Sequence, residues 1–179
     1  MFTHCRGEQR RERTWHDGLV PRSHGARAWF VTGLALGLAA CGSDPQPARS
    51  ATATPVAPEV AAEALVDGTN AARAEADVPL LKRSSCATEA ALPRATALVG
   101  NPELVHAPLD DVLADCAVST AAENLSRAPA VTAPQDVVAA WMESPGHRVN
   151  ILDPTLTEVG VACVEDGTAT LCAQIFLGP

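Results

Sequence analysis

Residues 141–152 constrain the fold of this chain more than any other stretch. They read Trp-Met-Glu-Ser-Pro-Gly-His-Arg-Val-Asn-Ile-Leu. The pattern predicts the end of one helix, a stop, and a second short helix, with Ser144 as its cap and Pro145 at its first position, where no backbone N–H is needed. His147 then falls in the first turn, near exposed N–H groups and the positive end of the helix dipole, which favours a neutral imidazole.

The amino-terminal region has the layout of an export signal. Residues 28–40 are uncharged and largely apolar, and Arg22 and Arg27 precede them. Such a run is too short to span a bilayer stably. It ends in Leu-Ala-Ala-Cys-Gly at residues 38–42, which resembles a bacterial lipobox and implies cleavage before Cys41 and a lipid on its sulfur. We therefore expect residues 1–41 to be a leader and lipoprotein signal; the alternative is a plain secreted protein cut nearby.

Charge divides the chain at the same point. Residues 1–41 hold six Arg against three acids, whereas residues 42–179 hold seven Lys and Arg against eighteen acids, a net charge near −11. An acidic export product is a poor partner for nucleic acid or for anionic headgroups, so membrane contact is expected through the lipid anchor alone. Residues 42–57 are small, polar and interrupted by Pro, which predicts a disordered linker. Residues 58–179 then form one domain.

Cysteine usage agrees with export. Apart from Cys5 and Cys41, the chain has four cysteines, at positions 86, 116, 163 and 172. An even number in an exported domain suggests two disulfides, with three connectivities to choose from. Cys163 and Cys172 flank a predicted hairpin with Asp166-Gly167 in its turn, which would place them opposite each other. Pairing of Cys86 with Cys116 follows by elimination. Metal binding is the weaker alternative, because no Cys-x-x-Cys spacing occurs.

The domain mixes helices and strands. The expected elements are a helix over 58–76, an extended link at 78–81, a helix from 84 or 85 to 99 with a kink or restart at Pro93, an irregular acidic loop over 109–122, a helix over 133–143, the helix after Ser144, and strands at 158–164 and 169–176. Thr132 and Gln135 have the spacing of a capping box. Asn70 and Arg73 are expected as fixed surface or supporting groups of the first helix.

Histidine is scarce after the leader. Only His106 and His147 occur there, both at predicted helix or loop edges, with Glu123 and Glu143 available to pair with them. Two histidines and one or two glutamates in a cleft could bind a divalent metal or exchange protons. The alternative is that the histidines are unrelated surface groups, because no pair has the i, i+4 spacing of a zinc helix.

Several short motifs occur in an order that resembles one family. They are His106 after an apolar pair, Glu123-Asn124-Leu125, the run at 141–152, Val159-Gly160-Val161, and Gln174-x-Phe176. In this order they resemble the short bacterial form of the CAP superfamily, the cysteine-rich secretory, antigen five and pathogenesis-related proteins. The resemblance covers about residues 60–178. It implies an α+β fold, a three-layer α-β-α sandwich around a small antiparallel sheet.

The resemblance also implies a cleft. By position, His106 matches the family's first cleft histidine, Glu123 the acid of its Gly-Glu-Asn motif, and His147 the second histidine. Glu143 is a weaker match for the fourth member, because it precedes His147 by only four residues, and it could instead be an exposed acid at a helix end. Ala122 also departs from the pattern, since it replaces the usual Gly before Glu123.

Three functions compete at this stage. The resemblance implies a non-enzymatic binding module of the cell surface, whose cleft holds a small lipid or glycan, or zinc or another divalent cation through His106 and His147. A metal-dependent or acid/base hydrolase with Glu123 as base would use the same residues but lacks an evident nucleophile, so no catalytic residue is assigned. A structural role in the envelope would need the fold and anchor but no particular side chains.

Overall fold

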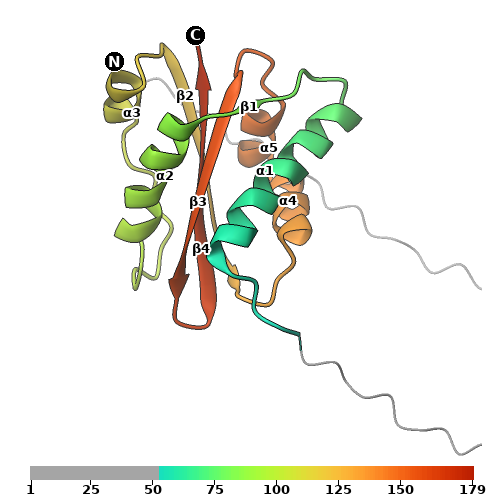
Figure 1. Cartoon of the computed structure of the whole chain (residues 1–179), viewed down its shortest axis with the longest axis vertical. Coiled ribbons are helices and arrows are strands. Elements are labelled where there is room, and N and C mark those ends of the chain that lie inside the picture. The colour runs from blue at the N-terminus through green and yellow to red at the C-terminus, as the bar shows by residue number, and fades with distance from the viewer. Residues whose placement is uncertain (1–52) are drawn as a thin grey trace, which may run out of the picture. The chain divides into compact units, whose positions relative to one another are not determined.

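Five helices cover the two faces of a four-stranded sheet in residues 53–179, the part of the chain that the computed structural model describes (Figure 1). In chain order the elements are α1 Pro58–Glu75, β1 Lys82–Arg83, α2 Ser85–Ala97, α3 Asp110–Asp115, β2 Thr120–Pro129, α4 Pro134–Glu143, α5 Pro145–Leu152, β3 Glu158–Asp166 and β4 Ala169–Gly178. The leader at 1–41 and most of the 42–57 linker lie outside these residues. Within residues 53–179, no helix combines the length and the apolar character that a membrane crossing requires.

The strands lie in the order β1-β3-β4-β2, so β4 is internal and β2 forms one edge of the sheet. β4 pairs antiparallel with both β3 and β2, which confirms the predicted antiparallel sheet, and the two-residue β1 adds a parallel pair beside β3. Because β4 has a neighbour on each side and helices on both faces, its residues from Leu171 onward are buried.

The two helix layers pack on opposite faces of the sheet, as the α-β-α prediction required. Side chains of a strand alternate between faces. Phe176 therefore packs in a cluster with residues of α1, α4 and α5, while its neighbour Ile175 packs with residues of α2 and α3. Figure 1 shows α2 and α3 on one side of the strands and α1, α4 and α5 on the other. The fold is thus three-layered, with a core in each interface.

The predicted acidic loop over 109–122 is wrong. Residues 110–115 form α3, and β2 begins at Thr120 and pairs with β4 all the way to Pro129. β2 starts with the small residues Thr, Ala and Ala, which have no alternation of large apolar side chains that would mark a strand. Its strand conformation comes from the partner, because β4 offers a continuous ladder of backbone groups along the whole segment.

Two helix boundaries differ from the sequence prediction. α2 runs without interruption from Ser85 to Ala97 with Pro93 inside it, so no restart occurs. The carbonyl that Pro93 leaves without a helical donor belongs to Glu89, an exposed residue whose backbone can bond to water. The capping box at Thr132 is also wrong: α4 has Ala133 as N-cap without a side-chain bond, and the backbone N–H of Thr132 closes a turn onto Pro129 at 2.8 Å.

Arg73 is not a surface group. It is fully buried in α1, and its guanidinium donates to four backbone carbonyls: Pro79 at 2.6 Å, Ile151 at 2.8 Å, Asp153 at 2.9 Å and Leu156 at 3.2 Å. The last three acceptors lie in or just after α5. One side chain therefore ties the first helix of the domain to the segment that carries His147.

Both predicted disulfides are confirmed. Cys163 and Cys172 face each other across β3 and β4 with a Cα–Cα distance of 4.1 Å, and Cys86 joins Cys116 at 5.8 Å. The hairpin between β3 and β4 turns at Gly167, which has φ 65°, a left-handed conformation that glycine adopts without steric cost. The Cys86–Cys116 bond links α2 to the end of α3.

Gly160 in β3 sets how closely α2 approaches the sheet. A Cβ at this position would lie 2.2 Å from the backbone nitrogen of Thr88 in α2. The facing side of α2 is made of Ala87, Ala91 and Ala95, all fully buried. Small residues on both sides let the helix backbone rest directly on the strand, which brings Arg94 of α2 over the neighbouring strands.

Candidate functional site

The candidate site lies at the β2 edge of the sheet, where the loop after α2 and the first turn of α5 approach from opposite layers. Consecutive side chains of β2 point to opposite faces of the sheet. Glu123 points to the α2 face and Asn124 to the α5 face, as their partners show: Arg94 of α2 bonds to the first and Asn150 of α5 to the second. An edge strand can present neighbouring side chains to both faces and still leave its outer side open.

Glu123 has its two carboxylate oxygens engaged by different partners. Its side chain is only 3% exposed. Nδ1 of His106 lies 2.7 Å from Oε1, and Nη1 of Arg94 donates to Oε2 at 3.2 Å. Because a carboxylate only accepts, Nδ1 of His106 must carry the proton. In the neutral ring, Nε2 of His106 is then left as an acceptor for whatever enters the cleft.

Arg94 also holds the loop that carries His106. Its guanidinium donates to the carbonyls of Ala107 at 3.3 Å and Pro108 at 2.6 Å, the two residues after His106. It also pairs with Asp111 of α3 at 2.8 Å. A single buried arginine therefore sets the position of both Glu123 and the His106 loop.

His147 forms the other wall. It lies in the first turn of α5, where Pro145 occupies the predicted first position and Ser144 the N-cap, although Ser144 makes no side-chain cap bond. Nδ1 of His147 is buried and has no hydrogen-bond partner among residues 53–179. The imidazole lies 6.4 Å from the Trp141 ring, centroid to centroid.

The environment of His147 favours its neutral form. Burial lowers the pKa of His147, and the nearby His106 lowers it further. The sequence predicted a neutral ring from the helix dipole; the direction agrees, but the causes are burial and the second histidine. The candidate site therefore combines an imidazole that favours its neutral form with a fixed carboxylate–histidine pair.

The pKa of His147 can be checked directly. We expect its ring proton signals in NMR to titrate with a midpoint below about 6.5, the value of an unperturbed histidine. The unfolded chain then binds this proton more readily, so the free energy of unfolding should fall as pH drops through about 6.5 and level off below the folded pKa. His147→Gln should remove that part of the pH dependence. A midpoint at or above the unperturbed value would contradict the assignment.

The run at 141–152 also covers the outer side of β2. Trp141 Nε1 donates to the carbonyl of Leu125 at 3.1 Å, and Asn150 Nδ2 donates to the carbonyl of Glu123 at 3.1 Å. Both carbonyls point away from β4, so β4 cannot satisfy them. The tryptophan and asparagine of this run thus fasten α4 and α5 to the edge strand.

A buried polar chain supports the same edge from within. Asn124 donates to Gln174 at 3.1 Å, Gln174 donates to Thr69 of α1 at 2.9 Å, and Asn150 donates to Asn124 at 2.9 Å. Asn124, Gln174 and Thr69 are fully buried. Every amide here has a partner, so the chain fixes the spacing of α1, α5 and the sheet without an unpaired polar group.

The structure places His106 in contact with Glu123, and His147 close enough to His106 for the second charge to lower its pKa. Glu143 ends α4 as an exposed residue, and it forms no side-chain hydrogen bond or ion pair with the other three in residues 53–179. Within the same residues, no group of three or more His, Cys, Asp and Glu side chains is arranged to hold a metal ion.

Arg94 is the site residue that the sequence analysis missed. A signal was present, because Arg94 follows Ala91 by three residues and so shares the small, buried face of its helix. A charged residue on such a face needs a buried partner of opposite charge. Glu123, which follows the small residues Ala121 and Ala122, is the acid that fills this role.

Comparison with known proteins agrees with the motifs. A family model described as the cysteine-rich secretory protein family, CAP, matches residues 66–176. The uncharacterized protein YkwD of Bacillus subtilis (strain 168) is 46% identical over 59 residues, which are 33% of this chain and 21% of that protein. The matched part thus spans about a fifth of that relative's length.

Solved structures share the fold. An outer surface protein of Borrelia burgdorferi has a TM-score of 0.61 at 16% identity, covering 71% of this chain and 98% of that one. An extracellular protein of Bacillus anthracis containing an SCP domain has a TM-score of 0.57 at 24% identity, covering 70% and 45%. At these identities the likeness shows the fold alone. The family model, in contrast, matches more than half of the chain and covers His106, Glu123 and His147. The chain belongs to the CAP family of cysteine-rich secretory proteins.

Proposed function

We propose that this chain is a binding module of the cell surface, with a cleft in which His106, Glu123 and His147 hold a small ligand. One observation carries the proposal: the cleft presents a preset carboxylate–histidine pair, held from behind by Arg94, opposite a neutral imidazole. Such groups can orient a bound molecule through Nε2 of His106.

Binding is favoured over hydrolysis by the state of Glu123. A general base needs a carboxylate oxygen that can take a proton from water. Both oxygens of Glu123 already accept bonds from His106 and Arg94. The carboxylate therefore suits a fixed anionic floor better than a base. The ligand class that the cleft chemistry admits is a lipid or glycan with a hydroxyl group, or a divalent cation.

Two imidazoles, those of His106 and His147, are available to a zinc ion, and the carboxylate of Glu123 is hydrogen-bonded to the first of them. Glu123 orients His106 as carboxylates orient metal-bound histidines. Because residues 53–179 supply no third ligand in place, the ligand or water would have to complete the tetrahedral shell. His106 and His147 are thus the residues that would hold the cation.

Zinc titration by calorimetry tests this occupant. The wild-type chain is expected to release heat that is lost in His106→Ala and in His147→Ala, whereas the matched variant Glu143→Ala should behave as wild type because Glu143 is exposed and forms no hydrogen bond or ion pair with His106, Glu123 or His147 within residues 53–179. Equal heat from all four proteins would exclude the two histidines as ligands. A panel of ester and peptide substrates, assayed on the same proteins, tests the hydrolase alternative. Turnover by the wild type that is lost in Glu123→Gln would show catalysis and contradict a purely binding role.

Export and anchoring belong to the same proposal. Two disulfides are typical of an oxidising compartment, and the structural relatives are described as extracellular and outer surface proteins. Cys41 lies in the lipobox-like sequence, outside the described residues. Incorporation of a labelled fatty acid into cells that express the wild type, and its absence with Cys41→Ser, is the measurement that checks the anchor.

A further inference from the structure

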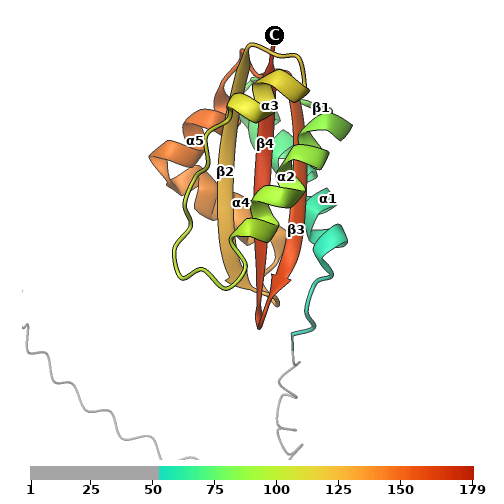
Figure 2. The same cartoon turned by 90° about the vertical axis from the view of Figure 1, so that its left-hand side faces the viewer.

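A groove runs along the outer side of β2, next to the cleft. Its floor is residues 125–128 of β2, one wall is α4 with Asp136, Val137 and Ala140, the other wall contains Leu104, and His147 lies at one end. Figure 2 shows the loop between α2 and α3 running beside β2. Arg127 holds that loop by donating to the carbonyls of Leu98 and Pro102.

The floor of the groove contains backbone groups without a partner. The register with β4 and the bond from Ala130 N–H to Thr168 C=O direct the even-numbered residues of β2 toward β4 and the odd-numbered ones outward. Of the outward groups, the carbonyls of Glu123 and Leu125 are covered by Asn150 and Trp141. The N–H of Leu125 and both backbone groups of Arg127 accept or donate no bond within residues 53–179.

The unpaired backbone groups of Leu125 and Arg127 indicate which kind of molecule fits the groove. We propose that an extended peptide carrying a basic side chain binds along this groove and adds its backbone to the edge of β2. A peptide residue beside Arg127 can exchange two hydrogen bonds with it, as a new strand does. An acyl chain would cover the apolar walls but leave these donors and the acceptor unpaired.

The charges along the groove also favour a basic peptide. Asp136 lines the groove, is exposed, and has no ion-pair partner in the described chain. The one cation of the lining, Arg127, lies with Nε 2.9 Å from Oδ2 of Asp166. The groove therefore offers an unbalanced acid to a basic side chain of the peptide. The inference goes beyond the proposed cleft function, since it requires neither Glu123 nor His106.

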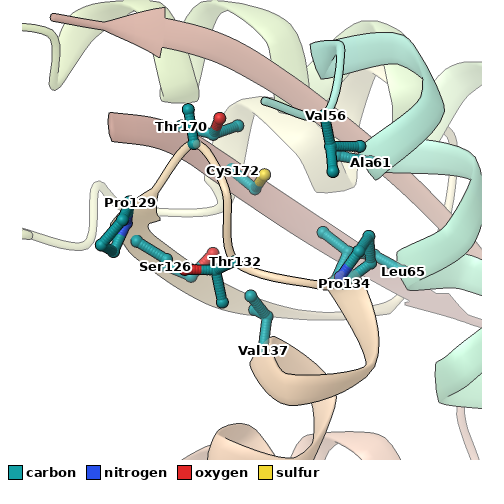
Figure 3. A pocket seen from close by; sticks show the side chains of 12 residues that line it. Val56, Ala61, Leu65, Ser126, Pro129, Thr132, Pro134, Val137, Thr170 and Cys172 are labelled. Carbon is teal, nitrogen blue, oxygen red and sulfur yellow. The ribbon is translucent and has the colours of Figure 1, made fainter. Parts of the chain in front are cut away.

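A neighbouring hollow does not compete for this role. Figure 3 shows it between Val56, α1 and the start of α4, with the side chains of Ala61, Leu65 and Val137 around it. Its volume is about 20 Å³, room for one water molecule. It is a packing defect where the chain enters the domain, and Val56 closes it by donating to the carbonyl of Ala130 at 2.9 Å.

Two synthetic peptide pools test the groove on the immobilised full chain. One is a pool of acetylated hexapeptide amides with lysine fixed at the third position and the others varied; the second has the same side chains with every backbone nitrogen methylated. The first pool should be retained about tenfold better, because methylation removes the hydrogen bonds that a strand needs. Bound peptides should also shift the ¹⁵N–¹H signal of Arg127.

Matched variants on α4 locate the binding. Ala139 and Ala140 are both exposed on this helix, but only Ala140 lines the groove. Ala140→Arg should lose about tenfold in retention by filling the groove and repelling lysine, whereas Ala139→Arg should match wild type. Equal retention of the two pools, equal loss in both variants, or an unshifted Arg127 signal would overturn the proposal. Retention of laurate in place of peptide, lost in Ala140→Arg, would assign the groove to an acyl chain and overturn it as well.

Discussion

Arg73→Ala is expected to lower the free energy of unfolding by about 3–5 kcal/mol, because each buried carbonyl left without a hydrogen-bond donor costs about 1–3 kcal/mol. The substitution strips the hydrogen-bond donors from four backbone carbonyls, three of which lie in or just after α5. Burial lowers the pKa of Arg73, and Asp153 partly offsets this. The guanidinium is thus kept in place at a desolvation cost that its carbonyl acceptors must compensate.

Urea unfolding followed by circular dichroism measures this effect. Arg148→Ala is the matched control, because Arg148 is exposed on α5 and its removal should change stability by less than about 0.5 kcal/mol. The stability of Arg73→Lys should fall between those of the two alanine variants. A lysine ammonium has three donors and cannot reach all four carbonyls that the planar guanidinium of Arg73 binds. A stability of Arg73→Ala equal to that of Arg148→Ala would show that α5 is held by packing alone.

Glu123→Leu is the second large effect, up to about 3–5 kcal/mol, because it removes the buried carboxylate partner of Arg94 and leaves the guanidinium only the exposed Asp111 as an anionic partner. Both side chains are nearly inaccessible, at 7% and 3% exposure for Arg94 and Glu123. Replacing both residues, Arg94→Leu with Glu123→Leu, should restore much of the loss, since apolar groups need no partner. The coupling in this double-mutant cycle is the quantity to measure, by urea unfolding of the four proteins.

Hydrogen exchange gives the site-specific side of that experiment. Loss of Arg94 frees the carbonyls of Ala107 and Pro108, so amides near His106 should exchange faster while those of β3 and β4 do not. If the loss in the double variant equals the sum of the losses in the two single variants, the coupling is zero and the ion pair contributes nothing to stability. Uniform acceleration of exchange across the sheet would indicate a general loss of stability and no local role.

Sequence patterns predicted the elements whose signals are local. The short helix after Ser144, the hairpin with its disulfide, and the second disulfide all follow from turn residues, proline and cysteine positions. The capping box failed because Thr132 had a competing turn. Where Ser, Thr and Pro lie within a few residues of one another, the sequence determines the first residue of a helix only to within one or two positions. The surrounding packing decides which residue it is.

The missed features depend on contacts between distant residues. β2 has no strand pattern of its own and is made a strand by β4, some fifty positions later in the chain. Arg73 and Arg94 look like ordinary surface cations of Ala-rich helices, and only their partners in α5 and β2 make them buried. Propensity describes a residue against its neighbours in sequence, so it cannot report a partner brought in by folding. The two histidines and Glu123 were found from the scarcity of histidine and from the family motifs; the contacts of Arg94 with Glu123 and with the His106 loop were not.

The Cys86–Cys116 bond makes the two walls of the cleft mechanically unequal. Together with the chain between them, the two cysteines close a covalent ring that contains the whole His106 loop. His147 has no such restraint, because α5 is held by the Arg73 carbonyl bonds and by side-chain contacts alone. If the cleft widens to admit a ligand, α5 is the side that moves, while the disulfide-closed ring that carries His106 stays in place.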